Sequence, residues 1–192
     1  MSYLSTPTRI PAFSPLDLQN ASLIWKGMAI LLGTGILAAS SYISVPMIPV
    51  PITMQTFAVT MIGALYGWRL GGATVVAWLV EAAVGMPVLA GGASGLLPFI
   101  GPTSGYLFSF PIIAALAGLL AEKGWNGHRP VLAFVSMMLA NLMCLAIGGA
   151  VLGVMIGAEK ALLLGVLPFL IGAILKSALA AAVLRLAARR TA

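Results

Sequence analysis

The chain has 192 residues, of which 61% are hydrophobic and only 7% are charged, and its mean hydropathy is +1.10. Soluble domains carry about 25% charged residues, so this composition excludes a fold with a fully water-facing surface. The net charge of +6 does not indicate nucleic-acid binding, because the basic residues stand singly at the ends of apolar segments. The composition predicts an all-α integral membrane protein.

The apolar segments predict a compact bundle of six transmembrane helices in one domain over residues 22–192, preceded by a cytoplasmic or interfacial tail over residues 1–21. A spanning helix needs about 20 mostly apolar residues, so some of the six are short. Residues 157–167 are expected to form a short piece at the interface, and Pro168 suits the first position of the last helix. We expect the helices at about Trp25–Tyr42, Met54–Tyr66, Leu70–Val84, Thr103–Leu120, Val131–Ile156 and Pro168–Ala188.

Two of the predicted connections are irregular and contain no Lys or Arg. Residues 44–53 hold three prolines, which exclude a helix there, and residues 85–102 are rich in glycine and proline. Irregular backbone at membrane depth is tolerated only where it is buried in protein or lines a cavity. We expect these two loops to form the wall or lid of a pocket, with two ordinary connections as the alternative.

The basic residues indicate how the chain is oriented. With six spans, one side of the membrane holds eight of them and the opposite side holds only Lys160. Because cytoplasmic loops carry the excess of Lys and Arg, both termini are predicted to be cytoplasmic, and the pocket opens outward. The eight are Arg9, Lys26, Arg69, Lys123, Arg129, Arg185, Arg189 and Arg190.

Lys176 is the basic residue that falls deep inside a predicted helix, about two turns after its start. A lysine at the centre of a spanning helix costs about 3 kcal/mol, so it is expected to face the bundle interior and meet an anion, for which the substrate is one candidate. The alternatives are that it reaches the interface or pairs with Glu81. Glu81 could instead accept a ligand N–H or reach the outer interface, and Asn141 is expected either to contact a ligand or to bond a neighbouring helix.

The sequence indicates no catalytic residue, metal site or cofactor, so no enzyme is predicted. Its carboxylates do not pair at catalytic or metal-binding spacing, and its one histidine, His128, lies in a turn far from any buried serine. The chain also lacks the glycine-rich phosphate loop of ATP-binding proteins, so another subunit would have to hydrolyse any ATP that transport consumes. The carboxylates are Asp17, Glu81, Glu122 and Glu159.

Four blocks of the sequence resemble the BioY family, in the family's order and over most of residues 25–190. They are 45–57 (VPMIPVPITMQTF), 85–92 (GMPVLAGG), 101–106 (GPTSGY), and 168–172 (PFLIG) with Lys176. BioY proteins are the biotin-binding S components of energy-coupling factor (ECF) transporters. The resemblance implies biotin uptake across the cytoplasmic (inner) membrane of a prokaryote, with an ECF coupling transmembrane subunit and two ATPase subunits. The alternatives are an S component for another vitamin, or a self-sufficient biotin transporter that works as a homo-oligomer without these subunits.

Biotin has an apolar bicyclic body, a ureido group and an anionic tail, which together call for apolar walls, a few polar groups and one cation. A buried lysine that meets a carboxylate would satisfy both charges, and loop N–H groups beside glycine can approach oxygen atoms closely. With the matching blocks, these arguments predict the ligand-binding residues Lys176, Asn141, Glu81, Gln55, Thr53, Gly91, Gly92, Ser94 and Tyr106.

Small residues on the first helix allow another helix to approach closely, and from the residues alone we favour packing inside the bundle. In S components such residues form the docking surface for the coupling subunit, and Gly35, Ala38 and Ala39 stand at matching positions. One departure from the family pattern matters, while Leu89, which stands where the family often has an aromatic residue, is a milder one. The family commonly has an aspartate three residues before the lysine, where this chain has Ala173. Either Glu81 supplies a carboxylate, or the ureido ring is held differently.

Overall fold

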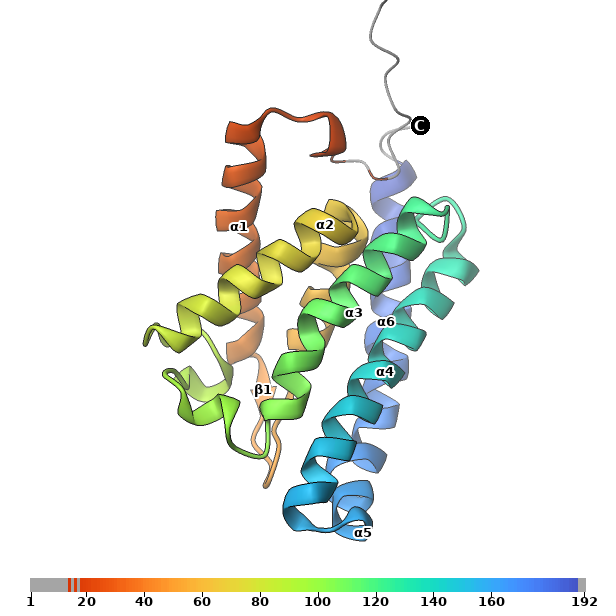
Figure 1. Cartoon of the computed structure of the whole chain (residues 1–192). Coiled ribbons are helices and arrows are strands. Elements are labelled where there is room, and N and C mark those ends of the chain that lie inside the picture. Colours follow the sequence, from red (N-terminus) through yellow and green to blue (C-terminus); the bar gives the residue numbers. More distant parts are fainter. Residues whose placement is uncertain (1–13, 15, 17, 190–192) are drawn as a thin grey trace, which may run out of the picture.

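The structure, a computed structural model, describes residues 14, 16 and 18–189 and consists mostly of helices (Figure 1). This confirms the predicted all-α class; most of the predicted tail lies outside the described residues. The long helices are α1 (Leu23–Tyr42), α2 (Gln55–Ala83), α3 (Ser104–Glu122), α4 (Pro130–Ile156) and α6 (Leu167–Arg189). The short elements are η1 (Leu18–Asn20), β1 (Ser44–Val45), β2 (Ile52–Thr53), η2 (Ala90–Gly92), η3 (Leu97–Phe99), α5 (Ala158–Ala161) and the π-helical turn η4 (Leu162–Val166).

The outer faces of the helices are apolar, as a lipid-facing surface requires. Leu23, Val154 and Ile171 are 85%, 89% and 70% exposed, and they belong to three different helices. Among the described residues, α1, α3, α4 and the continuous run Ala158–Arg189 are each long and apolar enough to cross a membrane. The chain is therefore an integral membrane protein, since contiguous apolar surface of this extent is stable only against lipid.

Helix α2 is interrupted at Gly67, whose φ of 83° and ψ of 170° are not helical. The interruption leaves arms of residues 55–66 and 68–83, which stand where the second and third helices are predicted. At 1.5 Å per residue the arms are roughly 18 Å and 24 Å long. Four runs, rather than the predicted six, meet the criteria of length and hydropathy in the described part of the chain.

The last helix differs from its prediction, because it does not begin at Pro168. Helical structure starts at Ala158 and continues through η4 directly into α6. Proline has no N–H to give to the preceding turn, and the π-helical turn just before it changes the local bonding pattern. The predicted interfacial piece over residues 157–167 is therefore the first part of a longer helical run.

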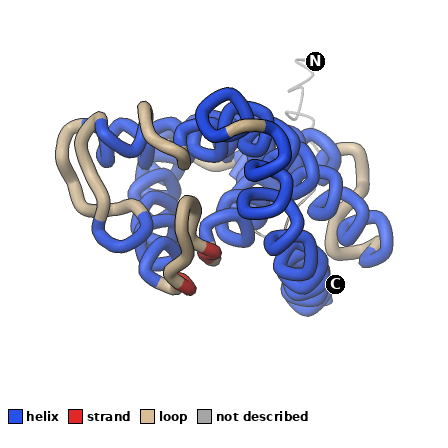
Figure 2. The backbone as a smooth tube through the Cα atoms, turned by 90° about the horizontal axis from the view of Figure 1, so that it is seen from below, coloured by secondary structure: helices blue, strands red, loops and turns tan. Residues whose placement is uncertain are grey.

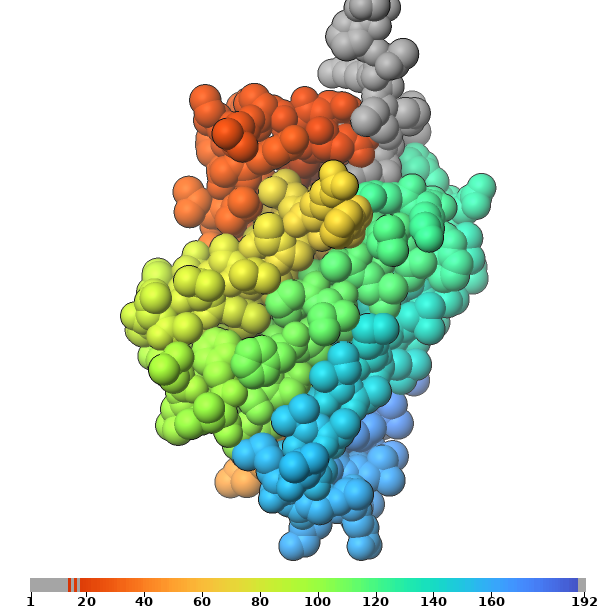
Figure 3. All heavy atoms as spheres, viewed as in Figure 1, coloured from red at the N-terminus to blue at the C-terminus, as the bar shows by residue number. Residues whose placement is uncertain are grey.

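The helices pack in chain order: α1 on α2, α2 on α3, α3 on α4, and α4 on α6. Glycine allows the closest of these crossings, between α2 and α3. A Cβ atom at Gly63 would lie 2.1 Å from the Ala114 oxygen, and one at Gly118 would lie 2.4 Å from the Trp68 nitrogen. Close backbone approach of this kind is how membrane helices pack without a hydrophobic driving force. In Figure 3, α1 lies at one edge of the molecule.

The connections gather at two ends of the bundle. At one end, the Trp68 N–H donates to Glu122 Oε1 over 3.1 Å, so the interruption of α2 lies beside the α3–α4 turn, near the start of α1 and the end of α6 (Figure 1). At the other end, the β1–β2 pair and the loop over residues 84–103 lie together, as Figure 2 shows from that side.

The basic residues divide between these two ends. Lys160 lies on α5 at the second end, which holds β1 and β2. Of the eight basic residues predicted to share a side, Lys26, Arg69, Lys123, Arg129, Arg185 and Arg189 lie at the first end, and Arg9 and Arg190 lie outside the described residues.

We expect Gly63→Ala to lower the stability of the fold by about 1–3 kcal/mol, because the added methyl group would force α2 away from α3. Thermal unfolding of the purified protein in detergent measures this. Gly27→Ala on α1 is the matched control, since a Cβ atom there meets nothing within 4 Å. Equal melting temperatures for the two variants would contradict the tight α2–α3 crossing.

Candidate functional site

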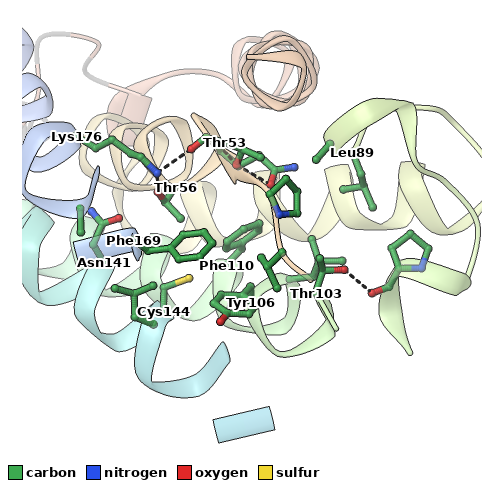
Figure 4. A pocket seen from close by; sticks show the side chains of 18 of the residues that line it. Thr53, Thr56, Leu89, Thr103, Tyr106, Phe110, Asn141, Cys144, Phe169 and Lys176 are labelled. Carbon is green, nitrogen blue, oxygen red and sulfur yellow. Dashed lines mark hydrogen bonds between the residues drawn. The ribbon is translucent and has the colours of Figure 1, made fainter. Parts of the chain in front are cut away.

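A cavity of about 200 Å³ lies at the end of the bundle that holds β1, β2 and the 84–103 loop (Figure 4). Its walls come from the segment around β2, from the 84–103 loop, and from α3, α4 and α6. The two irregular loops therefore border a cavity, as their proline and glycine content predicts. Most of the wall is apolar, with a few polar groups that point inward.

Helical spacing explains which residues reach the cavity. On α6, Phe169, Ala173 and Lys176 are four and three residues apart, which places them on one face. On α4, Asn141 and Cys144 are three residues apart and share a face in the same way. Each helix thus presents one stripe to the cavity.

Lys176 reaches across the cavity to the segment around β2. Its Nζ donates to the Thr53 carbonyl over 2.7 Å and to Thr56 Oγ1 over 3.0 Å. The side chain is half-buried, and no carboxylate among the described residues lines the cavity. Two neutral oxygens therefore hold the ammonium group, and its charge remains unneutralised within the described part of the chain.

Glu81 lies near the end of α2, away from the cavity lining. It forms no salt bridge with Lys176, so the pairing considered for these two residues is not made in this structure. Whether its carboxylate contacts a ligand in place of the family's aspartate stays a prediction.

Asn141 is 3% exposed and bonds a neighbouring helix, which was one of its two predicted roles. Its Nδ2 donates to the Met137 carbonyl over 2.9 Å and to Ser177 Oγ on α6 over 3.2 Å. Figure 4 shows the amide oxygen turned toward Phe169 and the cavity. Asn141 also lines the cavity, so its amide oxygen is placed to accept a hydrogen bond from a ligand.

Thr53 and Gln55 also line the cavity, but their side chains bond mainly to the protein itself. Thr53 Oγ1 donates to Gln55 Oε1 over 3.1 Å and accepts from the Gln55 N–H over 3.2 Å. Gln55 Nε2 donates to Ser41 Oγ on α1 over 3.0 Å. The segment around β2 is thereby fixed to α1.

Aromatic rings form one wall of the cavity. The Tyr106 hydroxyl donates to the Gly165 carbonyl over 2.7 Å, which holds its ring 6.2 Å from the ring of Phe169 at an angle of 25°. Phe110 also lines the cavity and stacks on Trp78 with a centroid distance of 6.0 Å. Because the Tyr106 hydroxyl is already bonded, Tyr106 presents mainly its ring to the cavity.

Three of the predicted ligand contacts lie just outside the cavity wall. Gly91, Gly92 and Ser94 do not line it, whereas their neighbours Ala90 and Ala93 do. The Gly92 N–H donates to the Leu89 carbonyl over 3.0 Å and so closes the η2 turn. This N–H group is thus already used within the loop. Whether any of these residues binds a ligand remains a prediction.

The residues that line the cavity without having been predicted as ligand contacts include Thr56, Phe110, Cys144 and Phe169. A signal for three of these four was available. Cys144 follows the predicted Asn141 by three residues, Phe110 follows the predicted Tyr106 by four, and Phe169 precedes Lys176 by seven, so helical periodicity places each pair on one face. Thr56 carries no such signal, because it follows the irregular segment around β2.

Two of the three small residues predicted for docking, Gly35 and Ala39, lie on the exposed side of α1. A Cβ atom at Gly35 would meet nothing within 4 Å, whereas one at Gly33 on the same helix would lie 2.6 Å from the Thr74 side chain. Gly33 therefore serves packing within the bundle, while Gly35 and Ala39 form an exposed face. The third predicted residue, Ala38, is half-buried and packs against the core.

Comparisons with known proteins agree on one family. The family model described as "BioY family" matches residues 14–192. A probable biotin transporter BioY of Pyrococcus horikoshii is 35% identical over 143 residues, which are 74% of this chain and 83% of the relative. Biotin transporter BioY2 of Lactococcus lactis subsp. cremoris is 30% identical over 168 residues, which are 84% of this chain and 88% of the relative.

The fold also has a solved counterpart. The crystal structure of the S-component for biotin from an ECF-type ABC transporter matches with a TM-score of 0.76 and covers 90% of this chain and 96% of that one. The identity is 24%, so this likeness concerns the fold alone. The family model spans nearly the whole described chain and the relatives align over most of their lengths, and the chain therefore belongs to the BioY family.

Proposed function

We propose that this chain binds biotin in the cavity and serves as the S component of an ECF-type vitamin uptake system. The observation that carries the proposal is the cavity's composition: apolar and aromatic walls, one cation at Lys176, and no carboxylate among its described lining residues. A cationic vitamin such as thiamine would meet an unfavourable charge there. The names of the relatives as biotin transporters support the same ligand.

The polar groups suit the parts of biotin. The bicyclic body packs against Tyr106, Phe110 and Phe169. Lys176 meets a ligand oxygen, most favourably the carboxylate, since both buried charges are then neutralised. The amide oxygen of Asn141 accepts a ureido N–H, and so takes over the part of the aspartate that this chain replaces with Ala173. Hydrogen bonds to buried polar groups of this kind fix orientation and supply specificity.

The six crossings and their direction belong to the proposal as well. The two arms of α2 cross as separate short helices, in addition to α1, α3, α4 and the run Ala158–Arg189. The end that carries most of the basic residues faces the cytoplasm, in accordance with the positive-inside rule. The cavity then opens to the outside, where biotin is captured.

Transport through this subunit needs a source of energy, for which the chain has no phosphate loop. A transmembrane coupling subunit that docks on the Gly35–Ala39 face of α1, with two cytoplasmic ATPases, supplies it. The exposure of Ala39 and the open space around Gly35 support this assignment. Transport by a homo-oligomer without these partners is the alternative, and uptake assays in cells that lack all coupling subunits separate the two.

We expect the purified chain to bind tritiated biotin stoichiometrically and to leave thiamine unbound. Equilibrium binding in nanodiscs measures both ligands, and mass spectrometry identifies any small molecule that co-purifies with the chain. Recovery of thiamine without biotin would overturn the assignment of the ligand.

Lys176→Ala should weaken biotin binding at least tenfold, a loss of about 1.4 kcal/mol, because the cavity loses its cation. Lys160→Ala is the matched control: Lys160 is exposed at the same end of the bundle and lies outside the cavity lining. We expect the control to bind as the unaltered protein does. If Lys176→Ala binds as tightly as Lys160→Ala, the lysine has no part in recognition.

The orientation is testable by labelling single cysteines in intact cells. In a Cys144→Ala background, a membrane-impermeant maleimide should label Leu96→Cys, which lies in the exposed 84–103 loop, and should not label His128→Cys at the opposite end. Both should react after the cells are opened. Labelling of His128→Cys alone in intact cells would show that the orientation is the reverse of the one proposed.

A further inference from the structure

A continuous series of hydrogen bonds joins α1 to the cavity lysine. Starting on α1, the Ser41 hydroxyl donates to the Leu37 carbonyl over 2.8 Å and accepts from Gln55 Nε2 over 3.0 Å. Gln55 Oε1 in turn accepts from Thr53 Oγ1 over 3.1 Å, and the carbonyl of the same threonine accepts from Lys176 Nζ over 2.7 Å. Three separate segments of the chain therefore share one network.

The network is deeply buried. Leu37 and Ser41 are 0% exposed, Gln55 is 6% exposed and Thr53 is 9% exposed. Hydrogen bonds are stronger away from water, and breaking one there leaves a polar group unsatisfied, which is costly. A displacement at one end of the series therefore costs less free energy when it is transmitted along intact hydrogen bonds than when one of these bonds breaks.

Gln55 lines the cavity, yet its amide is engaged on both sides. Nε2 is bonded to Ser41 and Oε1 to Thr53, and the Gln55 backbone N–H donates to Thr53 Oγ1. These bonds fix the position of Thr53, whose carbonyl oxygen receives the ammonium group of Lys176. Gln55 is thus built into the support of the lysine.

We propose that Gln55 is a positioning residue that links α1 to Lys176 through Ser41 and Thr53, so that occupation of the cavity and the position of α1 are coupled. This rests on the proposed biotin function. When a ligand oxygen shares the ammonium group, the Lys176–Thr53 bond changes, and the network carries the change to Ser41. Coupling between two sites is reciprocal, so a partner that shifts α1 alters biotin affinity by the same factor.

The geometry of α1 makes this coupling useful. Leu37 and Ser41 lie one turn apart on the inward face of α1. Gly35 and Ala39 are also one turn apart, and each precedes its counterpart in the first pair by two residues. Two residues turn an α-helix by about 200°, so the pairs lie on nearly opposite faces. The network therefore ends directly behind the exposed Gly35–Ala39 face proposed for the coupling subunit.

The chain offers a matched pair of serines for a test. Ser40 and Ser41 are adjacent and buried, and both hydroxyls donate to the Leu37 carbonyl, over 2.7 Å and 2.8 Å. Ser41 also accepts the bond from Gln55, whereas Ser40 has no bond outside α1 among the described residues. Neither serine lines the cavity. Ser41→Ala and Ser40→Ala thus differ mainly in the bond between helices.

The experiment measures the biotin Kd of both variants in nanodiscs. Ser41→Ala should raise the Kd about fivefold, as the loss of one buried hydrogen bond implies, and Ser40→Ala should leave it unchanged. Ser41→Thr retains the hydroxyl and should restore the affinity. In a Gln55→Met background, Ser41→Ala should have no further effect, because its partner is gone. Equal Kd values for the two alanine variants would overturn the proposal.

A measurement without ligand separates this inference from the biotin assignment. Hydrogen–deuterium exchange of residues 52–56 in the ligand-free protein should quicken in Ser41→Ala and stay unchanged in Ser40→Ala. If the unaltered chain fails to bind biotin but shows this difference, the biotin assignment fails and the network stands. If exchange is the same in both variants, the network does not link α1 to this segment.

Discussion

The ammonium group of Lys176 lies midway along α6 in a bundle whose other groups are mostly apolar. A charge in such a place costs about 3 kcal/mol or more unless oxygen atoms surround it. Here the Thr53 carbonyl and Thr56 Oγ1 perform that task, and both belong to the segment that leaves β2 and begins α2. The need to hold this one cation thus ties α6 to a segment more than a hundred residues earlier in the chain.

This constraint explains why irregular backbone is found at the cavity end of a membrane bundle. A residue in a regular helix has its carbonyl bonded within the helix, so it is a poor partner for a lysine. The extended residues of β2 present the Thr53 carbonyl outward instead, and Ser41 and Gln55 hold the segment in place from the α1 side. The same lysine, held by neutral oxygens alone, keeps its charge available for an anionic ligand.

Local patterns in the sequence were sufficient to predict the membrane class, the two irregular loops, and Lys176 and Asn141 as candidate pocket residues. Thr53, Gln55 and Tyr106 came from the resemblance to the BioY family, and all five residues line the cavity. Local patterns were insufficient where the answer depended on contacts between distant segments. Nothing local reveals that Glu81 on α2 lies away from the cavity that Lys176 lines. The bond between Gln55 and Ser41 likewise follows from the crossing of α1 and α2, which no single segment encodes.

The central claim is that Lys176 is the cation that meets biotin in this cavity, and a crystal structure of the chain with biotin tests it most directly. We expect the ligand between Tyr106, Phe110 and Phe169, with a biotin oxygen within hydrogen-bond distance, about 2.7–3.2 Å, of Lys176 Nζ. Biotin bound elsewhere on the bundle, or bound in the cavity while Lys176 Nζ contacts only Thr53 and Thr56 as it does in this structure, would contradict the account.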